Sequence, residues 1–369
     1  MIKVFYGSEN AFNRRLPGGI RPKTLTQLIN ESDMNARGFY FNQEGTRQRP
    51  KRIRVSNLVA RTHEYARLSN SGLNGFLSIL SEYDIENMYF QNPPILIVNQ
   101  LKDEYGDKLE IEEYSFNKLD IKRVERFYDE YDNVILGQQK VALKLTNNLY
   151  RMAQGYNKDK PLVLLFYGPS GVGKTETAKF IASILEENLF RKQFSMYQSG
   201  EFWNYVFGGN HTESSLARDL LDRESNVILF DEFDKPNQIF YSAFYQMFDE
   251  GVFEDKNFKV NLKNCIIICT SNFLDIKDII STLGEPIYNR IDDAIQFNTL
   301  DTGTISKLIK LSFEKNYSEL TVEDKKLIEQ DATLKSLLEL GSRVSNARTV
   351  DKIVKEYIFT KIIIKKFKL

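Results

Sequence analysis

Short apolar runs recur through the middle of the chain, and segments with helix-like periodicity lie between them. The clearest runs are Leu162 to Phe166, Val227 to Phe230 and Cys265 to Cys269. Such runs are typical of strands buried on both faces, and strands that alternate with helices predict a parallel sheet. We therefore expect an α/β module over residues 131–300, with ligands at the carboxyl ends of its strands.

The two ends of the chain follow other patterns. Residues 301–369 read as helical with little strand character, which predicts a small α-helical domain. Residues 1–130 are predicted to form a separate domain of unknown type that binds an adaptor or a target. Its first half is polar, a helix-like stretch runs from Val59 to Leu80, and a strand-like piece from Ile95 to Val98 follows two prolines.

Charge is balanced over the whole chain but not along it. The 369 residues carry 50 Lys and Arg against 50 Asp and Glu, so net charge gives no hint of a polyanionic partner. Residues 1–67 hold 13 basic against 5 acidic residues, and residues 82–132 hold 6 against 14. Two interpretations stay open: the two regions pair within one domain, or a basic surface centred on Arg47 to Arg67 docks an acidic or nucleic-acid partner.

The chain has only two cysteines, Cys265 and Cys269, on one face of a predicted strand and too far apart to bond each other. Two cysteines fit a reducing compartment, and no Cys/His pattern suggests zinc. Met1 to Ser8 does not resemble a signal peptide, and no apolar run approaches the roughly 18–20 residues that span a membrane. We expect a cytoplasmic protein without a membrane partner.

The segment from Gly168 to Thr175 reads GPSGVGKT, follows the first apolar run and precedes a helix-like stretch. Strand, glycine loop and helix in this order are the context of a phosphate-binding P-loop. Glycines let backbone N–H groups turn toward phosphate oxygens, and the helix start favours anions. The predicted nucleotide-binding residues are Pro169, Ser170, Gly171, Val172, Gly173, Lys174, Thr175 and Glu176. Lys174 supplies charge to the phosphates and Thr175 a hydroxyl to Mg²⁺.

Polar residues end the other two runs. Val227 to Phe230 is followed by Asp231 and Glu232, and Cys265 to Cys269 by Thr270, Ser271 and Asn272. Two acids that end a buried strand are costly unless a cation lies nearby. We predict that Asp231 holds Mg²⁺, that Glu232 deprotonates the attacking water, and that Asn272 contacts the γ-phosphate or that water.

Taken together, these motifs resemble the ATPase domain of the Clp-type AAA+ chaperones, especially their second ring. The resemblance covers roughly residues 133–360. Beyond the P-loop and the strand ending in Asp231 and Glu232, it includes five segments: VILGQ at 134–138, QMFDEG at 246–251, IICTSN at 267–272, YNRID at 288–292 and NAR at 346–348. Asn346 stands where the family has glycine.

The resemblance assigns further roles. Ile135 and Leu136 belong to the adenine pocket, Asn272 is the first sensor, Arg290 the arginine finger, and Arg348 the second sensor. It implies ATP and Mg²⁺ as cofactors, a helical lid at 301–369, and a homo-oligomeric ring, usually of six subunits. The implied catalytic set is Glu232, Asn272, Arg290 and Arg348.

Family members thread polypeptide with a loop that carries Gly-Tyr-Val-Gly. The equivalent stretch here is Val206-Phe207-Gly208-Gly209, which keeps an aromatic side chain at Phe207. Phe207 is predicted either to grip an extended chain or to join a local aromatic cluster. The predicted function is remodelling or unfolding of polypeptides; the alternative is an ATP-dependent switch or scaffold acting with nucleic acid or partner proteins, as in DNA processing or antiphage defence.

Overall fold

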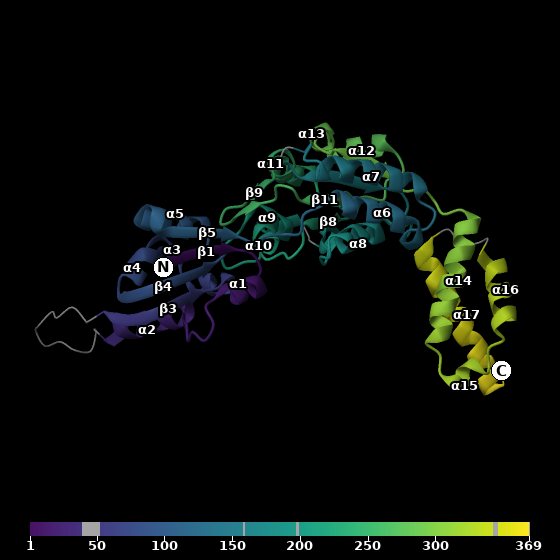
Figure 1. Cartoon of the computed structure of the whole chain (residues 1–369), viewed down its shortest axis with the longest axis horizontal. Helices are drawn as coiled ribbons and strands as arrows, with labels where there is room; N and C mark the ends of the chain where they lie inside the picture. Colours follow the sequence, from purple (N-terminus) through teal and green to yellow (C-terminus); the bar gives the residue numbers. More distant parts are fainter. Residues whose placement is uncertain (39–51, 158, 197–198, 342–345, 369) are drawn as a thin grey trace, which may run out of the picture. The chain divides into compact units, whose positions relative to one another are not determined.

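The computed structural model describes residues 1–38, 52–157, 159–196, 199–341 and 346–368. Two compact units are formed (Figure 1). Unit 1 combines Met1–Phe116 with Tyr197–Asn226 and Ile239–Lys263, and unit 2 combines Asn117–Met196 with Val227–Gln238 and Asn264–Leu369. The predicted divisions after residues 130 and 300 stay predictions, because these units cut the chain at other places.

Unit 1 is built on a five-stranded sheet in which every neighbouring pair is parallel. Its strand order is β2-β3-β4-β1-β5. The strands are β1 Ile2–Tyr6, β2 Lys23–Thr24, β3 Ile53–Ala60, β4 Tyr83–Gln91 and β5 Leu109–Glu113. The chain leaves β1 toward the β2 side, whereas β5 lies on the other side of β1. The carboxyl ends of β1 and β5 therefore flank the point where the strand order reverses.

Helices cover both faces of this sheet. They are α1 Glu9–Arg15, α2 Leu25–Gly38, α3 Asn70–Asn74, α4 Phe76–Leu80 and α5 Ile95–Tyr105, with a 3-10 helix at Thr62–Arg67. Because side chains alternate along a strand, Val4 joins the larger core with residues of α2 to α5, while Phe5 packs with Phe12 of α1 in a smaller one.

Two predictions for this region need correction. Ile95–Val98 is the first turn of helix α5, so the strand expected there is wrong. A run of four apolar residues cannot by itself distinguish a strand from a helix, and here Ile97 and Leu101, four residues apart, are both buried. The helix expected from Val59 to Leu80 is instead the end of β3 followed by three short helices.

The two oppositely charged regions pair within unit 1. Lys3 contacts Glu110 at 2.9 Å, Arg15 binds Glu112, and Arg54 forms an ion pair with Glu86. These contacts support pairing within one domain over a free basic surface. Arg47, Arg49 and Lys51, which belong to the predicted basic surface, lie outside the described residues.

Unit 1 also contains segments from the middle of the chain. They are α9 Ser199–Phe207, α10 Leu216–Leu221, α11 Tyr245–Glu250, and the antiparallel pair β9 Val252–Glu254 and β10 Lys259–Asn261; a 3-10 helix at Gln238–Phe244 precedes α11. Phe207 is the last residue of α9. Its ring lies 4.3 Å from that of Trp203 and 6.4 Å from that of Phe240, so it belongs to an aromatic cluster.

Unit 2 contains the predicted α/β module. Its sheet is also entirely parallel, in the order β12-β6-β11-β8-β7. The strands are β6 Leu162–Tyr167, β7 Phe190–Gln193, β8 Val227–Asp231, β11 Ile266–Thr270 and β12 Asp293–Gln296. The three apolar runs thus form neighbouring strands at the centre of the sheet. Cys265 and Cys269 are both buried, and neither forms a disulfide bond.

Helices α6 Ile121–Val134, α7 Gln139–Ala153 and α8 Lys174–Ile184 pack with Leu162, Leu164 and Phe166 of β6 in one core. Two short helices, α12 Ile276–Leu283 and α13 Glu285–Tyr288, follow β11. The rest is helical, as predicted: α14 Thr302–Ser318, α15 Val322–Lys325, α16 Gln330–Leu340 and α17 Ala347–Phe367.

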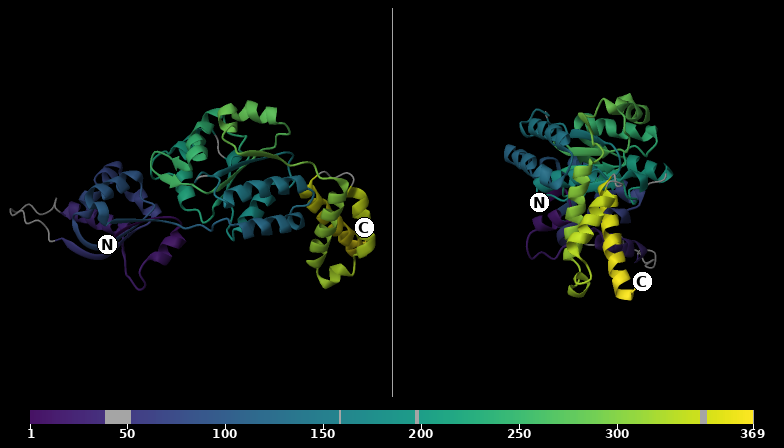
Figure 2. Two further views of the ribbon diagram at one scale, coloured as in Figure 1. Left: turned by 45° about the horizontal axis from the view of Figure 1, so that its top comes forward. Right: turned by 90° about the vertical axis from the view of Figure 1, so that its right-hand side faces the viewer.

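Helices α14, α16 and α17 lie side by side (Figures 1 and 2). They share a core to which α17 contributes Val350, Val354, Ile358 and Ile362 at four-residue intervals. Within the described residues, no helix combines the length and apolar character that crossing a bilayer requires.

Candidate functional site

A cavity of about 580 Å³ lies at the carboxyl ends of β6, β8 and β11 in unit 2. Parallel strands with different polar ends meet at this edge of the sheet, which is where open α/β sheets bind ligands. The cavity is lined by Ser170, Gly171, Gly173, Lys174, Thr175, Glu176, Arg191, Gln193, Asp231, Glu232, Thr270, Ser271, Asn272, Ala347 and Arg348. It brings together residues predicted from four separate segments: the glycine loop, the ends of β8 and β11, and the NAR segment.

The glycine loop runs from the end of β6 to the start of α8. At two positions its backbone conformation favours glycine. Gly168 has φ +132°, and a Cβ there would lie 2.1 Å from the carbonyl oxygen of Phe297. Gly173, the N-cap of α8, has φ +107°, and no side chain of the described residues caps the helix there. The first amides of α8 are therefore not covered by a capping side chain at the position where a helix favours an anion.

Lys174 is buried at the start of α8, and its ammonium donates to backbone carbonyls of the loop. The acceptors are Gly168 and, at 2.8 Å, Pro169; a third bond of 3.2 Å goes to Oδ1 of Asn272. Burial lowers the pKa of Lys174 to about 8, although Asp231 and Asp234 raise it; Arg348 adds to the lowering. A phosphate group would supply the negative charge that this buried ammonium lacks.

Asp231 ends β8 and is held by two polar side chains. Its Oδ2 accepts from Nε of Arg191 at 3.0 Å and also from Nη2, and its Oδ1 accepts from the hydroxyl of Thr270. The carboxylate is buried, so it needs a cation or donors beside it. In this structure the guanidinium of Arg191 meets that need.

Glu232 follows Asp231 in a left-handed backbone conformation, with φ +56°. This conformation is uncommon and costly for a residue with a side chain, and such residues often lie at functional sites. Its N–H donates to the hydroxyl of Thr270 at 3.0 Å, and its Oε2 accepts from Nε2 of Gln193 at 3.3 Å. Thr270 therefore organises both carboxylate residues from the neighbouring strand β11.

Arg348 and Ala347 reach the cavity from the start of α17. The side chain of Asn346 caps this helix by accepting from the N–H of Thr349 at 2.9 Å, and Ala347 N–H donates to the carbonyl of Gly171 at 3.0 Å. Asparagine in place of the family's glycine thus gives α17 its N-cap. The helix start lies directly against the glycine loop.

Other predicted site residues lie outside the cavity lining. Val172 is buried behind the loop, Ile135 packs close to Gly173, and Leu136 is half-buried beside it. Arg290 is half-buried after α13, donates to the carbonyl of Pro286 at 2.6 Å, and is not among the residues that line this cavity. Its predicted role thus requires another subunit's nucleotide.

Three residues at or beside this site received no role from the sequence. Arg191 and Gln193 lie on β7, a strand whose segment FRKQ reads as polar, and parallel pairing places Gln193 opposite Asp231. Gln138 donates to the carbonyls of Val172 at 3.3 Å and Asn298 at 2.8 Å, so it ties the glycine loop to the segment after β12. The sequence carries no local signal for the β7 pair; only the strand register reveals it.

Comparison with known proteins identifies the family of the domain that contains the glycine loop. A family model described as "AAA domain (Cdc48 subfamily)" matches residues 159–310. Residues 159–310 form an AAA domain. The match contains the glycine loop, Asp231, Glu232, Asn272 and Arg290, whereas Ile135, Leu136, Arg348 and the N-terminal sheet lie outside it.

The AAA domain is related to those of bacterial Clp proteins, which confirms the predicted family. The chaperone protein ClpB of Chlamydia caviae is 30% identical over 236 residues, covering 54% of this chain and 27% of that protein. ClpB of Clostridium tetani is 28% identical over 270 residues, covering 64% and 31%. The ATP-dependent Clp protease ATP-binding subunit ClpL of Staphylococcus aureus strain MRSA252 is 28% identical over 307 residues, covering 75% and 43%.

The chain thus spans less than half the length of these relatives. Among solved structures, a chain from a closed-state cryo-EM reconstruction of Hsp104 with ATPγS and FITC-casein superposes with a TM-score of 0.54 at 13% identity. The alignment covers 100% of this chain and 88% of that one. At this identity the likeness confirms the α/β fold of the AAA domain and carries no function.

Proposed function

We propose that this chain binds ATP with Mg²⁺ in the cavity of unit 2 and hydrolyses it. One observation carries the proposal: Lys174, Asp231 with Glu232, and Asn272, from three separate segments, line a single cavity at the strand ends. This is the set that phosphoryl transfer requires: a cation for the phosphates, carboxylates for metal and water, and a polar group for the γ-phosphate.

Binding begins with the amides of the glycine loop and with Lys174. The ammonium of Lys174 now donates to loop carbonyls and to Asn272. Phosphate oxygens compete well for these N–H bonds, because a bond between two charged groups is stronger than one to a carbonyl. Bound phosphate thus releases Oδ1 of Asn272 to face the γ-phosphate or the attacking water.

Thr175 and Asp231 would hold Mg²⁺, and both line the cavity. Their hydroxyl and carboxylate oxygens suit this ion, which would supply positive charge against the phosphates. The ion pair between Arg191 and Asp231 fits this assignment, since it indicates that the carboxylate site favours a cation. We expect Arg191 to move away from Asp231 when the nucleotide is bound.

Hydrolysis needs a base beside the terminal phosphate, and Glu232 takes this role. Its carboxylate accepts a proton from a water whose oxygen attacks the γ-phosphorus. The bond from that phosphorus to the bridging oxygen breaks, and ADP leaves with the electron pair. The contact between Gln193 and Oε2 of Glu232 holds the carboxylate in place before reaction.

The direct test compares two lysines on the same helix. Lys174→Ala should abolish ATP binding, measured by calorimetry, and phosphate release. Lys179→Ala is the matched control, because Lys179 is exposed and its ammonium pairs with nearby Glu176 at 2.8 Å. Equal ATP binding by both variants would refute the assignment of the cavity.

We further propose that Arg290 serves the nucleotide of an adjoining copy in a ring. Arg290→Ala and Lys174→Ala should each be inactive alone, since a guanidinium that stabilises γ-phosphoryl charge contributes about 10³–10⁵ in rate. Mixed together, they create interfaces with an intact glycine loop from one variant and an intact Arg290 from the other. Recovery of phosphate release on mixing supports the ring, and no recovery at any ratio contradicts it.

The relatives named as chaperones support polypeptide remodelling as the output of this ATPase. Phe207→Ala should keep ATP turnover and lose unfolding of a tagged substrate, whereas Phe207→Tyr should keep both. If the Phe207→Ala variant unfolds the substrate at the wild-type rate, Phe207 does not thread polypeptide. Its role is then packing against Trp203 and Phe240. No described contact favours the nucleic-acid alternative, since Arg54 and Arg61 are paired with Glu86 and Glu9.

A further inference from the structure

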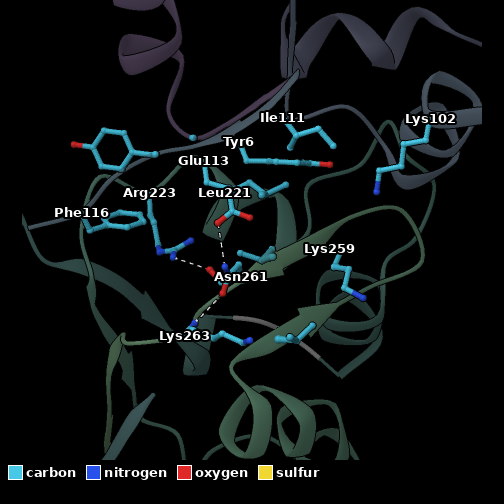
Figure 3. Close-up of a pocket in the computed structure, with 14 residues that line it drawn as sticks. Tyr6, Lys102, Ile111, Glu113, Phe116, Leu221, Arg223, Lys259, Asn261 and Lys263 are labelled. Carbon is cyan, nitrogen blue, oxygen red and sulfur yellow. Dashed lines mark hydrogen bonds between the residues drawn. The ribbon is translucent and has the colours of Figure 1, made fainter. Parts of the chain in front are cut away.

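A second cavity, of about 370 Å³, lies wholly within unit 1 (Figure 3). One wall comes from β1 and β5 of the N-terminal sheet, and the other from the β9–β10 pair and the end of α10. The wall on β1 and β5 includes Tyr6 and Glu113, the last residues of these strands. This is the reversal point of the strand order, where open parallel sheets bind ligands. The family match does not reach this wall.

The lining carries an excess of positive charge. Its cationic residues are Lys102, Arg223, Lys259 and Lys263, against one acid, Glu113. The ammonium groups of Lys102 and Lys263 form no ion pair within the described part of the chain, and both side chains are exposed toward solvent. These two groups can reach a ligand without first breaking an ion pair.

The remaining polar groups are fixed by hydrogen bonds. Arg223 is buried, donates to the carbonyls of Leu220 at 2.6 Å and Asn261 at 3.0 Å, and lies 4.5 Å from the centre of the Phe116 ring. Asn261 in turn donates to Glu113 at 3.0 Å. The Glu113 carboxylate is thereby engaged, so it opposes an incoming anion less than a free one would.

Aromatic and apolar surface accompanies the charge. In Figure 3 the Tyr6 ring lies beside Ile111, and its hydroxyl end is directed toward Lys102. Burial, with help from nearby Glu113, raises the pKa of Tyr6 to about 12, so the hydroxyl keeps its proton and can donate. A ring-bearing ligand would find a stacking surface and a cation at the same end of the cavity.

We propose that this cavity binds a nucleotide of monophosphate size, with its base against Tyr6 and Ile111 at the Lys102 end and its phosphate near Lys263. The volume falls in the range of small-molecule sites, about 300–1,000 Å³, and suits one base, one sugar and one phosphate. The site is separate from the ATP cavity, since none of its lining residues is shared.

Calorimetry on the full chain tests the site with AMP and CMP as probes. Binding should persist in Lys174→Ala, which disables the ATP cavity. It should weaken about tenfold or more in the double variant Lys102→Glu and Lys263→Glu, because the variant reverses two positive charges that line the cavity. The matched control, Lys108→Glu with Lys256→Glu, reverses two exposed charges of unit 1 outside the cavity and should bind like the wild type.

A second measurement needs no variant. AMP should protect Lys102 and Lys263 of the wild-type protein from an amine-reactive reagent, read by mass spectrometry, while Lys108 stays reactive. Three results would overturn the proposal: no binding of either probe, binding lost in Lys174→Ala but kept in the double variant, or displacement of AMP by an equal concentration of inorganic phosphate. Displacement by inorganic phosphate would show that the base of AMP contributes nothing to the binding affinity.

Discussion

From the lowered pKa of Lys174 we predict that the proposed ATP binding takes up a proton at mildly alkaline pH. Burial brings this pKa to about 8 in the protein without nucleotide, against 10.5 for an ordinary lysine. A triphosphate beside the ammonium favours the charged form and returns the pKa to its ordinary value or above. At a pH between these two pKa values, Lys174 has lost its proton in the free protein and holds it in the complex. ATP binding must therefore take up a proton from solution.

The two pKa values set the size of the effect. With 8 in the free protein and 10.5 or more in the complex, uptake is ~0.1 proton per site at pH 7, ~0.5 at pH 8 and ~0.9 at pH 9. ATP phosphates carry no titrating proton at the upper two pH values, so the signal belongs to the protein. The apparent affinity should fall as pH rises through this window, because the free lysine must first be protonated.

Calorimetry in buffers of different ionisation enthalpy measures this uptake directly. At pH 8.5 the observed heat should depend linearly on buffer enthalpy, with a slope near the predicted uptake. Lys174→Arg provides the control, because arginine stays charged throughout this range and cannot supply the signal. A slope of zero for the wild type at both pH 8 and pH 9 would show that Lys174 does not supply the positive charge beside the phosphates.

Three further predictions concern the same site. Glu232→Gln should bind ATP normally but hydrolyse it about 10²–10⁴ times more slowly, whereas Glu130→Gln, a change on α6 outside the cavity lining, should leave phosphate release unchanged. Arg191→Ala removes the guanidinium from buried Asp231 and should lower stability without nucleotide by about 1–2 kcal/mol in urea unfolding; Mg²⁺ with ADP should restore it. Gly168→Ala should unfold at lower urea than the wild type and bind no ATP, because its Cβ would lie 2.1 Å from a carbonyl oxygen; wild-type ATP affinity would contradict the loop geometry.

The site residues that the sequence predicted most directly are polar residues at the end of an apolar run. Asp231 and Asn272 each come at or just after the end of a short buried strand, and parallel strands necessarily bring such ends to one edge. The order of the strands did not need to be known. Any parallel arrangement with these strands as neighbours would have placed the two residues near the glycine loop.

Two kinds of feature could not be predicted: contacts that depend on the pairing register of strands, and elements whose apolar run fits a helix as well as a strand. Arg191 contacts Asp231 only because β7 pairs with β8, and a four-residue segment with three polar residues gives no sign of that strand. The N-terminal sheet was also missed, since β4 mixes polar and apolar positions and Ile95–Val98 carries as much strand as helix character. A wrong helix or strand prediction there concealed the whole parallel sheet.

The interleaving of the two units limits how this protein can be taken apart. The chain crosses from one unit to the other after residues 116, 196, 226, 238 and 263. Deleting residues 1–116 would strip residues 197–226 and 239–263 of the body with which they cluster, and two of the crossings lead within a few residues into β8 and β11. Grafting unit 1 onto another AAA domain would therefore require the transfer of three separate stretches of chain at once.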